Sequence, residues 1–392
     1  MKDEQLHKLL EAERYRQNQV INLIASENYV SPEVLQALGS EFVNKYAEGY
    51  PGKRYYGGNE VVDEVEELAR ERALEVFALA GDDWAVNVQP LSGTPANLAV
   101  YLGVLGAEKE KKIMGLSLDH GGHLSHGTPV SATGQFWTQI PYQVDTDSGQ
   151  LDYDALWETA KNERPDILVV GFTAYSREIN WSRLRGIADA YNIHLHVDMS
   201  HIAGLVAGGA YPSPFPYADT VMTTTHKTLR GPRSAIIFSR RDERELPRKI
   251  DKAIFPGLQG GPHINQVAAT AVALKEARSK EFADYAIQVV RNAQTLASEL
   301  QALGWPVISD GTDTHLFLID TWQGGEGVTG RDASDKLEAE GIIVNKNAIP
   351  GDERKPANPS GIRLGTAAET TRGKTEEDMK EIAKRIDEVL RD

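Results

Sequence analysis

Short apolar runs alternate with amphipathic stretches through the middle of the chain. Residues 167–172, 194–199, 220–224 and 235–238 are rich in β-branched and apolar side chains, which predicts buried strands. Between the first two runs, residues 181–191 carry apolar side chains at helical spacing. Strands that alternate with helices are typical of a parallel sheet covered by helices. The pattern therefore predicts an α/β fold with a mostly parallel sheet.

Further helices are predicted wherever apolar positions recur at helical spacing: residues 1–19, 60–80, 98–105, 263–277, 282–303 and 375–390. Gly81 supplies a stop for the second of these. A lone helix as short as the first is marginal in water, so we expect its Leu6, Leu9 and Leu10 to dock on something else. We expect a helical arm over residues 1–20, a large domain over 21–280 and a small C-terminal domain over 281–392.

Composition narrows the class of protein. The 392 residues include 42 Lys and Arg against 57 Asp and Glu, a net charge of −15, which disfavours nucleic acid or an anionic membrane as a partner. The chain has 0 cysteines, which excludes disulfides, thiolate metal sites and a thiol nucleophile and fits a reducing compartment. No uncharged apolar run approaches the roughly 18 residues of a membrane span. We expect a cytoplasmic protein.

A lysine follows one of the predicted strands, in the segment TTTHKTLRGPR at residues 223–233. Lys227 in that position is able to form a Schiff base with a carbonyl compound. Lysines at strand ends are also commonly solvated surface charges. This segment alone leaves both interpretations open.

An aspartate lies near the end of the strand predicted at residues 194–199. Ligands of open α/β sheets bind at that end of the strands, and Asp198 there is able to face the pyridine nitrogen of pyridoxal phosphate. A helix cap is an equally good explanation for the carboxylate. We interpret His194 and His196 on the same strand as structural or solvent-facing rather than as ligands.

The segment SGTPAN at residues 92–97 precedes the apolar helix predicted at 98–105. Hydroxyl groups, a glycine and free backbone N–H groups at a helix start form a phosphate cradle. An ordinary N-cap at Ser92 with Pro95 in the first turn explains the segment equally well.

These three features occur in one chain with Arg363, which lies in SGIRLG at residues 360–365 and is a candidate for binding a carboxylate. Their joint occurrence favours a pyridoxal-phosphate enzyme. A metal site is disfavoured, because His120, His123 and His126 lie in a Gly-rich loop that lacks a nearby acidic triad of ligand type.

Five longer motifs carry a family resemblance: NLIASEN at residues 22–28, NKYAEGYPGKRYYGG at 44–58, HGGH at 120–123, THKTLRGPR at 225–233 and FPGLQGGP at 255–262. With them the chain resembles the serine hydroxymethyltransferase family over residues 22–373. The resemblance implies the aspartate-aminotransferase-like fold type I of pyridoxal-phosphate enzymes, with the cofactor in the large domain and a smaller C-terminal α/β domain. It also implies a homodimer, with a tetramer as the alternative.

The activity implied by the resemblance is reversible transfer of the serine hydroxymethyl carbon to tetrahydrofolate, which gives glycine and 5,10-methylenetetrahydrofolate. Pyridoxal 5'-phosphate would be the cofactor, bound as an aldimine on Lys227, and tetrahydrofolate the co-substrate. The partners expected are therefore small molecules, namely serine, glycine and tetrahydrofolate.

The resemblance also assigns residues to roles. Lys227 would form the Schiff base, Asp198 would face the pyridine nitrogen, His123 would stack on the cofactor ring, His226 and Arg233 would complete the site, and Glu48 and Tyr46 would be the acid–base pair. Further cofactor contacts would be Ser92, Gly93, Thr94, Thr173, His201 and Thr224, with Tyr56, Gly260 and Gly261 reaching across from the neighbouring subunit. Substrate contacts would be Ser26, Tyr55, Arg363 and Glu48, and folate contacts Leu118, Gly122, Leu124 and Asn347.

One departure from the family pattern keeps an alternative open. Residues 355–359, KPANP, replace the sequence usual near the folate. A pyridoxal-phosphate aldolase acting on threonine-type substrates or α-methylserine, with weak folate dependence, is the first alternative. A catalytically silent binding protein on the same scaffold is the second. The presence of Lys227, Asp198, Glu48 and Arg363 disfavours this second alternative.

Overall fold

A seven-stranded sheet forms the centre of the computed structural model, which describes residues 2–392. Its strands lie in the order β4 (Trp84–Asn87), β10 (Ala235–Arg240), β9 (Thr220–Thr224), β8 (His194–Asp198), β7 (Ile167–Gly171), β5 (Lys112–Leu116) and β6 (Thr138–Tyr142). Strands β5 to β9 run parallel, whereas β10 is antiparallel to both of its neighbours. The predicted α/β class with a mostly parallel sheet is confirmed.

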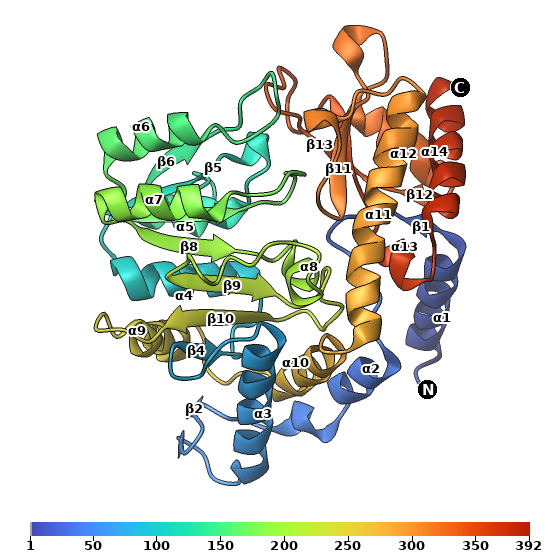
Figure 1. Ribbon diagram of the computed structural model, residues 1–392. Coiled ribbons are helices and arrows are strands. Elements are labelled where there is room, and N and C mark those ends of the chain that lie inside the picture. The colour runs from blue at the N-terminus through green and yellow to red at the C-terminus, as the bar shows by residue number, and fades with distance from the viewer. Residues whose placement is uncertain (1) are drawn as a thin grey trace.

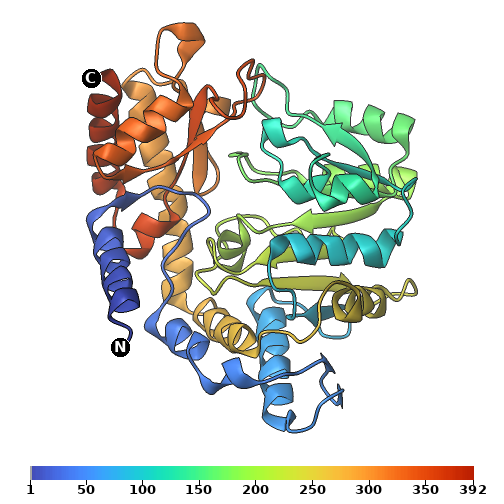
Figure 2. The same ribbon diagram turned by 180° about the vertical axis from the view of Figure 1, so that it is seen from behind.

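Helices cover both faces of this sheet. On one face α3 (Glu60–Val76), α6 (Tyr153–Glu163) and α7 (Trp181–Tyr191) bury their apolar sides. On the other, α4 (Gly93–Leu105) and α9 (Leu246–Lys252) form a second cluster with the opposite strand faces. Figure 1 shows α6 and α7 in front of the sheet, and Figure 2 shows α4 from behind. Burial on both faces explains why these strands are continuous apolar runs.

The remaining elements of residues 23–262 connect or flank these layers. They are α2 (Pro32–Leu38), η1 (Glu41–Asn44), β2 (Gly49–Tyr50), β3 (Lys53–Arg54), η2 (Leu118–His120), η3 (Leu124–His126), α5 (Ala132–Phe136), α8 (Ala203–Ala207) and η4 (Ala253–Leu258). Strands β2 and β3 pair as a small antiparallel hairpin. Figure 1 places β2 at the bottom of the molecule, beside α3.

The C-terminal part builds a separate three-stranded antiparallel sheet in the order β11 (Leu316–Asp320), β14 (Gly361–Gly365) and β13 (Asn345–Asn347). Around it lie α11 (Lys280–Ala302), η5 (Ile308–Asp310), η6 (Gln323–Gly325), α12 (Gly330–Ala339), β12 (Ile342–Ile343), α13 (Ala367–Thr371) and α14 (Glu376–Arg391). Helix α10 (Ile264–Glu276), which precedes them, packs instead against α2 and α3. Helices α11, α12 and α14 share a hydrophobic cluster with this sheet. Near the N-terminus, β1 (Ile21–Asn22) pairs with β12, so the chain's beginning joins this part. The division at residue 280 stays a prediction.

Helix α1 (Glu4–Gln19) occupies the predicted N-terminal helix and starts at Asp3, whose side chain accepts a hydrogen bond from the Leu6 amide. None of its residues is buried, and Leu6, Leu9 and Leu10 are exposed. What these leucines contact stays a prediction.

Two predicted helix limits were wrong. Helix α3 ends at Val76 rather than at residue 80, because Ala78 adopts a left-handed φ of 52° that breaks the helix before Gly81. Helix α4 begins at Gly93 rather than at residue 98, so the SGTPAN segment forms its first turn.

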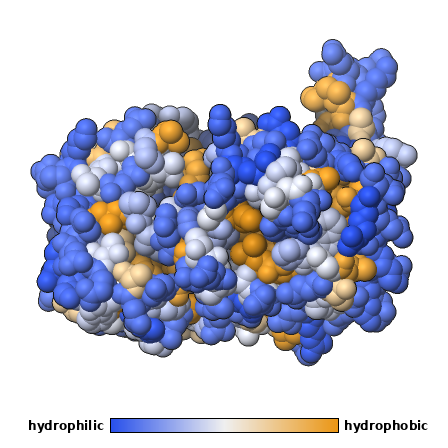
Figure 3. Space-filling model, turned by 90° about the horizontal axis from the view of Figure 1, so that it is seen from above, coloured by the Kyte–Doolittle hydropathy of each residue, from blue (hydrophilic) through white to orange (hydrophobic). Residues whose placement is uncertain are grey.

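None of the helices within residues 2–392 is long and apolar enough to cross a membrane. Figure 3, seen from above, shows hydrophobic residues interspersed with hydrophilic ones over this face.

Candidate active site

A cavity of about 360 Å³ lies where β7, β8 and β9 end and α4 begins. The arrowheads of β8 and β9 in Figure 1 point toward the C-terminal part. Thr173 follows β7, Asp198 ends β8 and Thr224 ends β9, and all three line this cavity. This is the end of an open α/β sheet at which ligands bind.

Most of the expected site residues meet here. Those that line the cavity are Ser26, Ser92, Gly93, Thr94, His123, Thr173, Asp198, His201, Thr224, His226, Lys227, Arg233 and Arg363. Phe172 and Ser200 also line it, although sequence reasoning gave neither a role. Segments that are more than 300 residues apart, such as those of Ser26 and Arg363, are thus brought to one wall.

Lys227 follows β9 directly and is 9% exposed. Burial lowers the pKa of its ammonium group to about 8, against the opposing attraction of Asp198. The Asn28 side chain donates a hydrogen bond of 3.0 Å to the Lys227 carbonyl and so fixes the backbone there. The lysine is therefore a buried group that loses its proton more readily than a solvated surface lysine.

Asp198 is held by three donors. Its Oδ2 accepts from Asn97 Nδ2 at 2.9 Å and from His126 Nε2 at 3.0 Å, and its Oδ1 accepts from the Ser200 amide at 3.1 Å. Burial alone would raise the pKa of this carboxyl, but the hydrogen bond from His126 and the nearby cations hold it well below its usual range. Asp198 is thus a buried anion facing the cavity.

The start of α4 provides unused donors. Ser92 precedes the helix without its side chain capping it, so its hydroxyl is free to face the cavity. Thr224 Oγ1 is buried with no hydrogen-bond partner among residues 2–392. At Gly93 an added Cβ would lie 2.8 Å from Thr224 Cγ2, so only glycine brings the backbone this close to β9. Hydroxyls and N–H groups at a helix N-terminus fit a phosphate group.

Arg363 comes from β14 of the C-terminal part and is 9% exposed. Its Nε donates to Asn345 Oδ1 at 3.0 Å and its Nη1 to the Thr173 carbonyl at 2.6 Å. Burial lowers its pKa to about 10, so the guanidinium keeps its charge at neutral pH. An oriented buried cation of this kind is suited to a carboxylate.

Three of the cavity's imidazoles are kept neutral by their surroundings. Burial lowers the pKa of His123 to about 4 and that of His226 to about 3, and it holds the pKa of His201 well below its usual range. His201 stacks on the buried His315, with Nδ1 of the former 3.2 Å from Nε2 of the latter. His315 Nε2 lies 3.1 Å from the Ala25 carbonyl, which links this pair to the segment of Ser26.

A second group of expected residues does not line the cavity of its own chain. Tyr46, Tyr55 and Tyr56 are 56%, 75% and 49% exposed, and Tyr46 donates to Glu48 Oε1 at 3.4 Å. Gly260 and Gly261 pack against this pair, since a Cβ on Gly260 would lie 3.1 Å from Glu48 Oε1. We call this set of residues, together with the β2–β3 hairpin, the aromatic surface. It lies at the bottom of Figure 1, away from the ends of β8 and β9.

The expected folate contacts lie around the cavity rather than in it. Leu118 on η2 and Leu124 on η3 are 45% and 47% exposed and flank Gly122 and His123 in the chain. Asn347 ends β13, next to the strand that carries Arg363.

In the structure the Asp198 carboxylate lies close to His123 and His126, although Asp198 is far from both in the sequence. His123, His126 and Asp198 bring ligand-type atoms within 4.8 Å of one another. The acidic member comes from β8, far along the chain, so spacing within the loop gives no signal of it. Asp198 already accepts from His126, as described above.

Several residues of the site were missed. Asn97 and Ser125 hydrogen bond to each other at 2.8 Å next to Asp198, and His315 supports His201. Sequence evidence for these residues was weak, because each is a single polar residue on a different element. Asn97 belongs to the SGTPAN segment, and its polar side chain inside a buried helix was the one indication of a role.

Comparisons with known proteins agree with this geometry. A family model described as "Serine hydroxymethyltransferase" matches residues 1–386. The chain is similar to a "Serine hydroxymethyltransferase" of Alkalilimnicola ehrlichii, 52% identical over 390 residues, which are 100% of this chain and 91% of the relative. It is also similar to proteins of Acinetobacter baylyi, "Serine hydroxymethyltransferase", and Pseudomonas aeruginosa, "Serine hydroxymethyltransferase 1", each 50% identical over 388 residues, 99% of this chain and 91% of the relative.

Proposed function

Because the chain belongs to the serine hydroxymethyltransferase family, we propose that the cavity around Lys227 is where its reaction takes place. The protein is a pyridoxal-phosphate-dependent transferase that moves the hydroxymethyl carbon of serine to tetrahydrofolate and leaves glycine. The observation that supports this location is the convergence of a buried lysine, a buried aspartate and a buried arginine on one cavity.

The cavity fits the cofactor's separate parts. The unpartnered Thr224 hydroxyl, the Ser92 hydroxyl and the backbone at Gly93 and Thr94 would hold the phosphate at the start of α4. His123 would lie against the ring and Asp198 would face its nitrogen. When bound there, the cofactor supplies an electron sink for charge that develops at the substrate's Cα.

The chain's own groups control protons around that sink. A lysine amine with a pKa of about 8 is deprotonated often enough near neutral pH to act as a nucleophile and to accept a proton at Nζ. Asp198 stays ionised and stabilises a proton on a nearby ring nitrogen. His201 and His226 are neutral, so they add no positive charge that would compete with that proton.

Serine would be held by its carboxylate. The Arg363 guanidinium is oriented by Asn345 and the Thr173 carbonyl, which use Nε and Nη1. Its Nη2 has no hydrogen-bond partner in the described chain and is left for the substrate, with the Ser26 hydroxyl beside it. The exposed Leu118 and Leu124, with Gly122 and Asn347, would form an apolar and polar rim for tetrahydrofolate.

A second copy of the chain would complete the site. Glu48, Tyr46, Tyr55 and Tyr56 belong to the aromatic surface, which is outside their own chain's cavity and exposes three tyrosines. Exposed aromatic clusters are typical of interfaces. We therefore assign these residues, with Gly260 and Gly261, to the cavity of the neighbouring subunit in a symmetric dimer.

Borohydride reduction of the holoenzyme, followed by peptide mapping, tests the location. We expect the pyridoxyl label on Lys227, and no label in Lys227→Ala. Lys346, which is exposed on β13, is the control position. A label on Lys346 or Lys53 in the wild-type enzyme would place the reaction elsewhere.

Subunit mixing tests the dimer separately. Lys227→Ala and Tyr56→Ala chains, each inactive or nearly so, should regain part of the activity when mixed, because one hybrid site is then intact. The control is a mixture of Lys227→Ala with Asp198→Asn, which lie in the same cavity and should not complement. No recovery in hybrids that are shown to form would mean that each chain builds its own site.

A further inference from the structure

Two histidines occupy a strand that is otherwise apolar and buried. His194 and His196 on β8 are 7% and 0% exposed, and the function described above uses neither. A buried imidazole is costly unless its nitrogen atoms are hydrogen bonded. Their hydrogen-bond partners therefore indicate what they do.

The two rings begin a continuous chain of hydrogen bonds that runs along the sheet to the active site. His194 Nε2 lies 2.9 Å from Thr220 Oγ1, which lies 2.8 Å from His196 Nδ1. His196 Nε2 then lies 2.9 Å from Asn97 Oδ1. The Asn97 Nδ2 group ends the chain by donating to Asp198 Oδ2 at 2.9 Å and to Ser125 Oγ at 2.8 Å.

Which group donates in each of these hydrogen bonds follows from the groups at the active-site end of the series. His123 Nδ1 accepts from the Ser125 amide at 3.2 Å, so it carries no proton, and the Ser125 hydroxyl at 2.7 Å must donate to it. That hydroxyl then accepts from Asn97, and Asp198, an anion, can only accept as well. Both constraints turn the Asn97 NH₂ toward the site and its oxygen toward His196.

The hydrogens farther from the active site, on His196, Thr220 and His194, are assigned in the same way. His196 must donate through Nε2 to the Asn97 oxygen, so in a neutral ring Nδ1 accepts from the Thr220 hydroxyl. Thr220 in turn accepts from His194 Nε2. Burial lowers the pKa of His196 to about 3 and that of His194 to about 4, which agrees with two neutral rings. All donors thus point toward Asp198 and His123, and hydrogen bonds aligned in this way strengthen one another.

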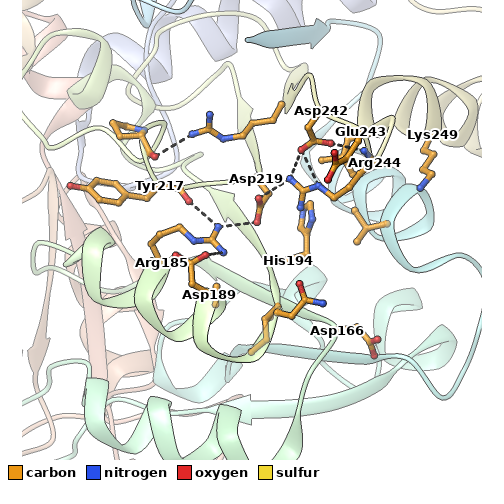
Figure 4. Close-up of a pocket in the computed structure, with 17 residues that line it drawn as sticks. Asp166, Arg185, Asp189, His194, Tyr217, Asp219, Asp242, Glu243, Arg244 and Lys249 are labelled. Carbon is orange, nitrogen blue, oxygen red and sulfur yellow. Dashed lines mark hydrogen bonds and ion pairs between the residues drawn. The ribbon is translucent and has the colours of Figure 1, made fainter.

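The outer end of this series of hydrogen bonds is His194, at the start of β8 and so at the opposite end of that strand from Asp198. His194 lines a charged cavity of about 660 Å³, and Figure 4 shows its ring below Arg244 and near Asp219. Asp219 is ion-paired to Arg185 and Arg244 at 3.0 and 2.9 Å, and its Oδ2 accepts from the Leu195 amide at 2.8 Å. These contacts fix the start of β8, and with it the outer ring of the chain.

We propose that His196, with Thr220 and His194 behind it, is a positioning residue that locks the Asn97 amide so that its one NH₂ group serves both Asp198 and, through Ser125, His123. The two groups that would flank the cofactor ring, Asp198 at its nitrogen and His123 on its face, then share one buried amide among their supports. This inference rests on the proposed location of the reaction at Lys227.

The first test concerns the protons themselves. With ¹⁵N-histidine in the holoenzyme, NMR should find His194 and His196 neutral with the proton on Nε2, and His123 with an unprotonated Nδ1. A proton on Nδ1 of His196 would require the Asn97 amide to be reversed and would overturn the proposal.

The second test compares four variants of the holoenzyme. His196→Phe removes both ring nitrogens. Thr220→Val removes the hydroxyl that contacts His196 Nδ1 and keeps the shape of the residue at position 220. His196→Gln restores a hydrogen-bond donor. Thr270→Val is the matched control, because Thr270 is 1% exposed and its hydroxyl has no partner among residues 2–392. The readouts are kcat and KM for serine and the ¹⁵N shift of the ring nitrogen in labelled pyridoxal phosphate.

We expect His196→Phe to lower kcat about three- to tenfold, the effect of one neutral hydrogen bond, with KM for serine nearly unchanged. The ring-nitrogen shift should move toward the unprotonated value, less in Thr220→Val, and His196→Gln should recover most of both effects. Wild-type kcat and ring-nitrogen shift in His196→Phe, or equal losses in Thr270→Val, would overturn the proposal. A wrong location at Lys227 would instead be revealed by the borohydride label, whatever these variants do.

Discussion

The Lys227 cavity and the aromatic surface both contain residues that the family resemblance assigns to the site, but they lie in opposite environments. In the cavity, Lys227, Asp198 and Arg363 are buried, and the Asp198 carboxylate accepts hydrogen bonds from three donors within its own chain. In the aromatic surface Tyr46, Tyr55 and Tyr56 face solvent, and Glu48 has a single long hydrogen bond of 3.4 Å. The first region is thus organised by the fold alone, whereas the second is a surface that lacks its complement. In the dimer proposed above, the aromatic surface would supply the remaining part of the site to the neighbouring subunit.

The largest effect should come from the centre of the buried region. Asp198→Asn removes the anion that, in the proposed function, would stabilise a proton on the cofactor's ring nitrogen, so we expect kcat/KM for serine to fall about a thousandfold or more. Steady-state kinetics on the holoenzyme measures this loss. Asp219→Asn is the control, since Asp219 is also buried and ion-paired but lies outside the cavity. Comparable losses in the two variants would mean that Asp198 matters only for folding.

The aromatic surface depends on one buried ion pair. Arg54 is joined to Glu66 at 2.6 Å with both side chains under 5% exposed, and its Nη1 also donates to the carbonyls of Ala47 and Gly49. Arg54→Gln leaves Glu66 buried without its cation, so we expect a loss of about 3 kcal/mol in the free energy of unfolding. Urea denaturation measures it. Arg70→Gln breaks the more exposed pair with Glu67 and should cost less than about 1 kcal/mol, and equal costs would contradict the distinction.

Glu48→Gln separates the two regions functionally. The amide cannot exchange a proton, so folate-dependent cleavage of serine should fall about a hundredfold. Cleavage of allo-threonine without folate should persist within a few-fold, because its aldehyde leaves without an acceptor and the Lys227 cavity is unchanged. Assays with both substrates measure the split, with Glu41→Gln on the exposed η1 as the control. Retention of folate-dependent serine cleavage would reduce Glu48 to a surface carboxylate.

The smallest effect concerns the pH response of Lys227. Its pKa lies below that of a free lysine, at about 8, because burial disfavours the charged form. In the apoprotein, the rate of its acylation should therefore rise about tenfold per pH unit up to about pH 8 and then level off. Mass spectrometric mapping measures the rate at each lysine, with Lys346 as the solvent-exposed control. A rate at Lys227 that climbs steadily to pH 10 would contradict the desolvation that the cavity imposes.

Sequence patterns predicted what depends on local periodicity. The strand at residues 220–224 and the helix at 181–191 coincide with β9 and α7, because both are bounded by abrupt changes in polarity. The end of α3 was wrong because Leu74, Val76 and Leu79 continue the apolar pattern past the residue where the backbone turns at Ala78.

The site residues divide in the same way. Lys227, Asp198 and Arg363 were predicted from sequence motifs that are ambiguous one by one, and the structure brings all three to one cavity. Asn97 and Ser125 were missed because their role exists only after α4, η3 and β8 have packed together. The histidines of β8 did carry a signal, since two imidazoles within an apolar run predict buried partners, but which partners they have depends on the tertiary fold.

In the dimer proposed above, helix α1 would make the helix content of the protein depend on its concentration. Its 16 residues bury none of their side chains, and Arg372 fastens the end of the helix by donating 2.8 Å to the Val20 carbonyl. A free helix of that length is only partly formed in water, and Leu6, Leu9 and Leu10 are exposed within this chain, so a subunit that covered them would stabilise the helix. If a second subunit covers it, dilution melts α1 while leaving the central sheet intact. The far-ultraviolet circular dichroism signal of the native protein, plotted against protein concentration, then follows the binding of the two subunits. The helicity of residues 4–19 would then report whether the subunits are associated.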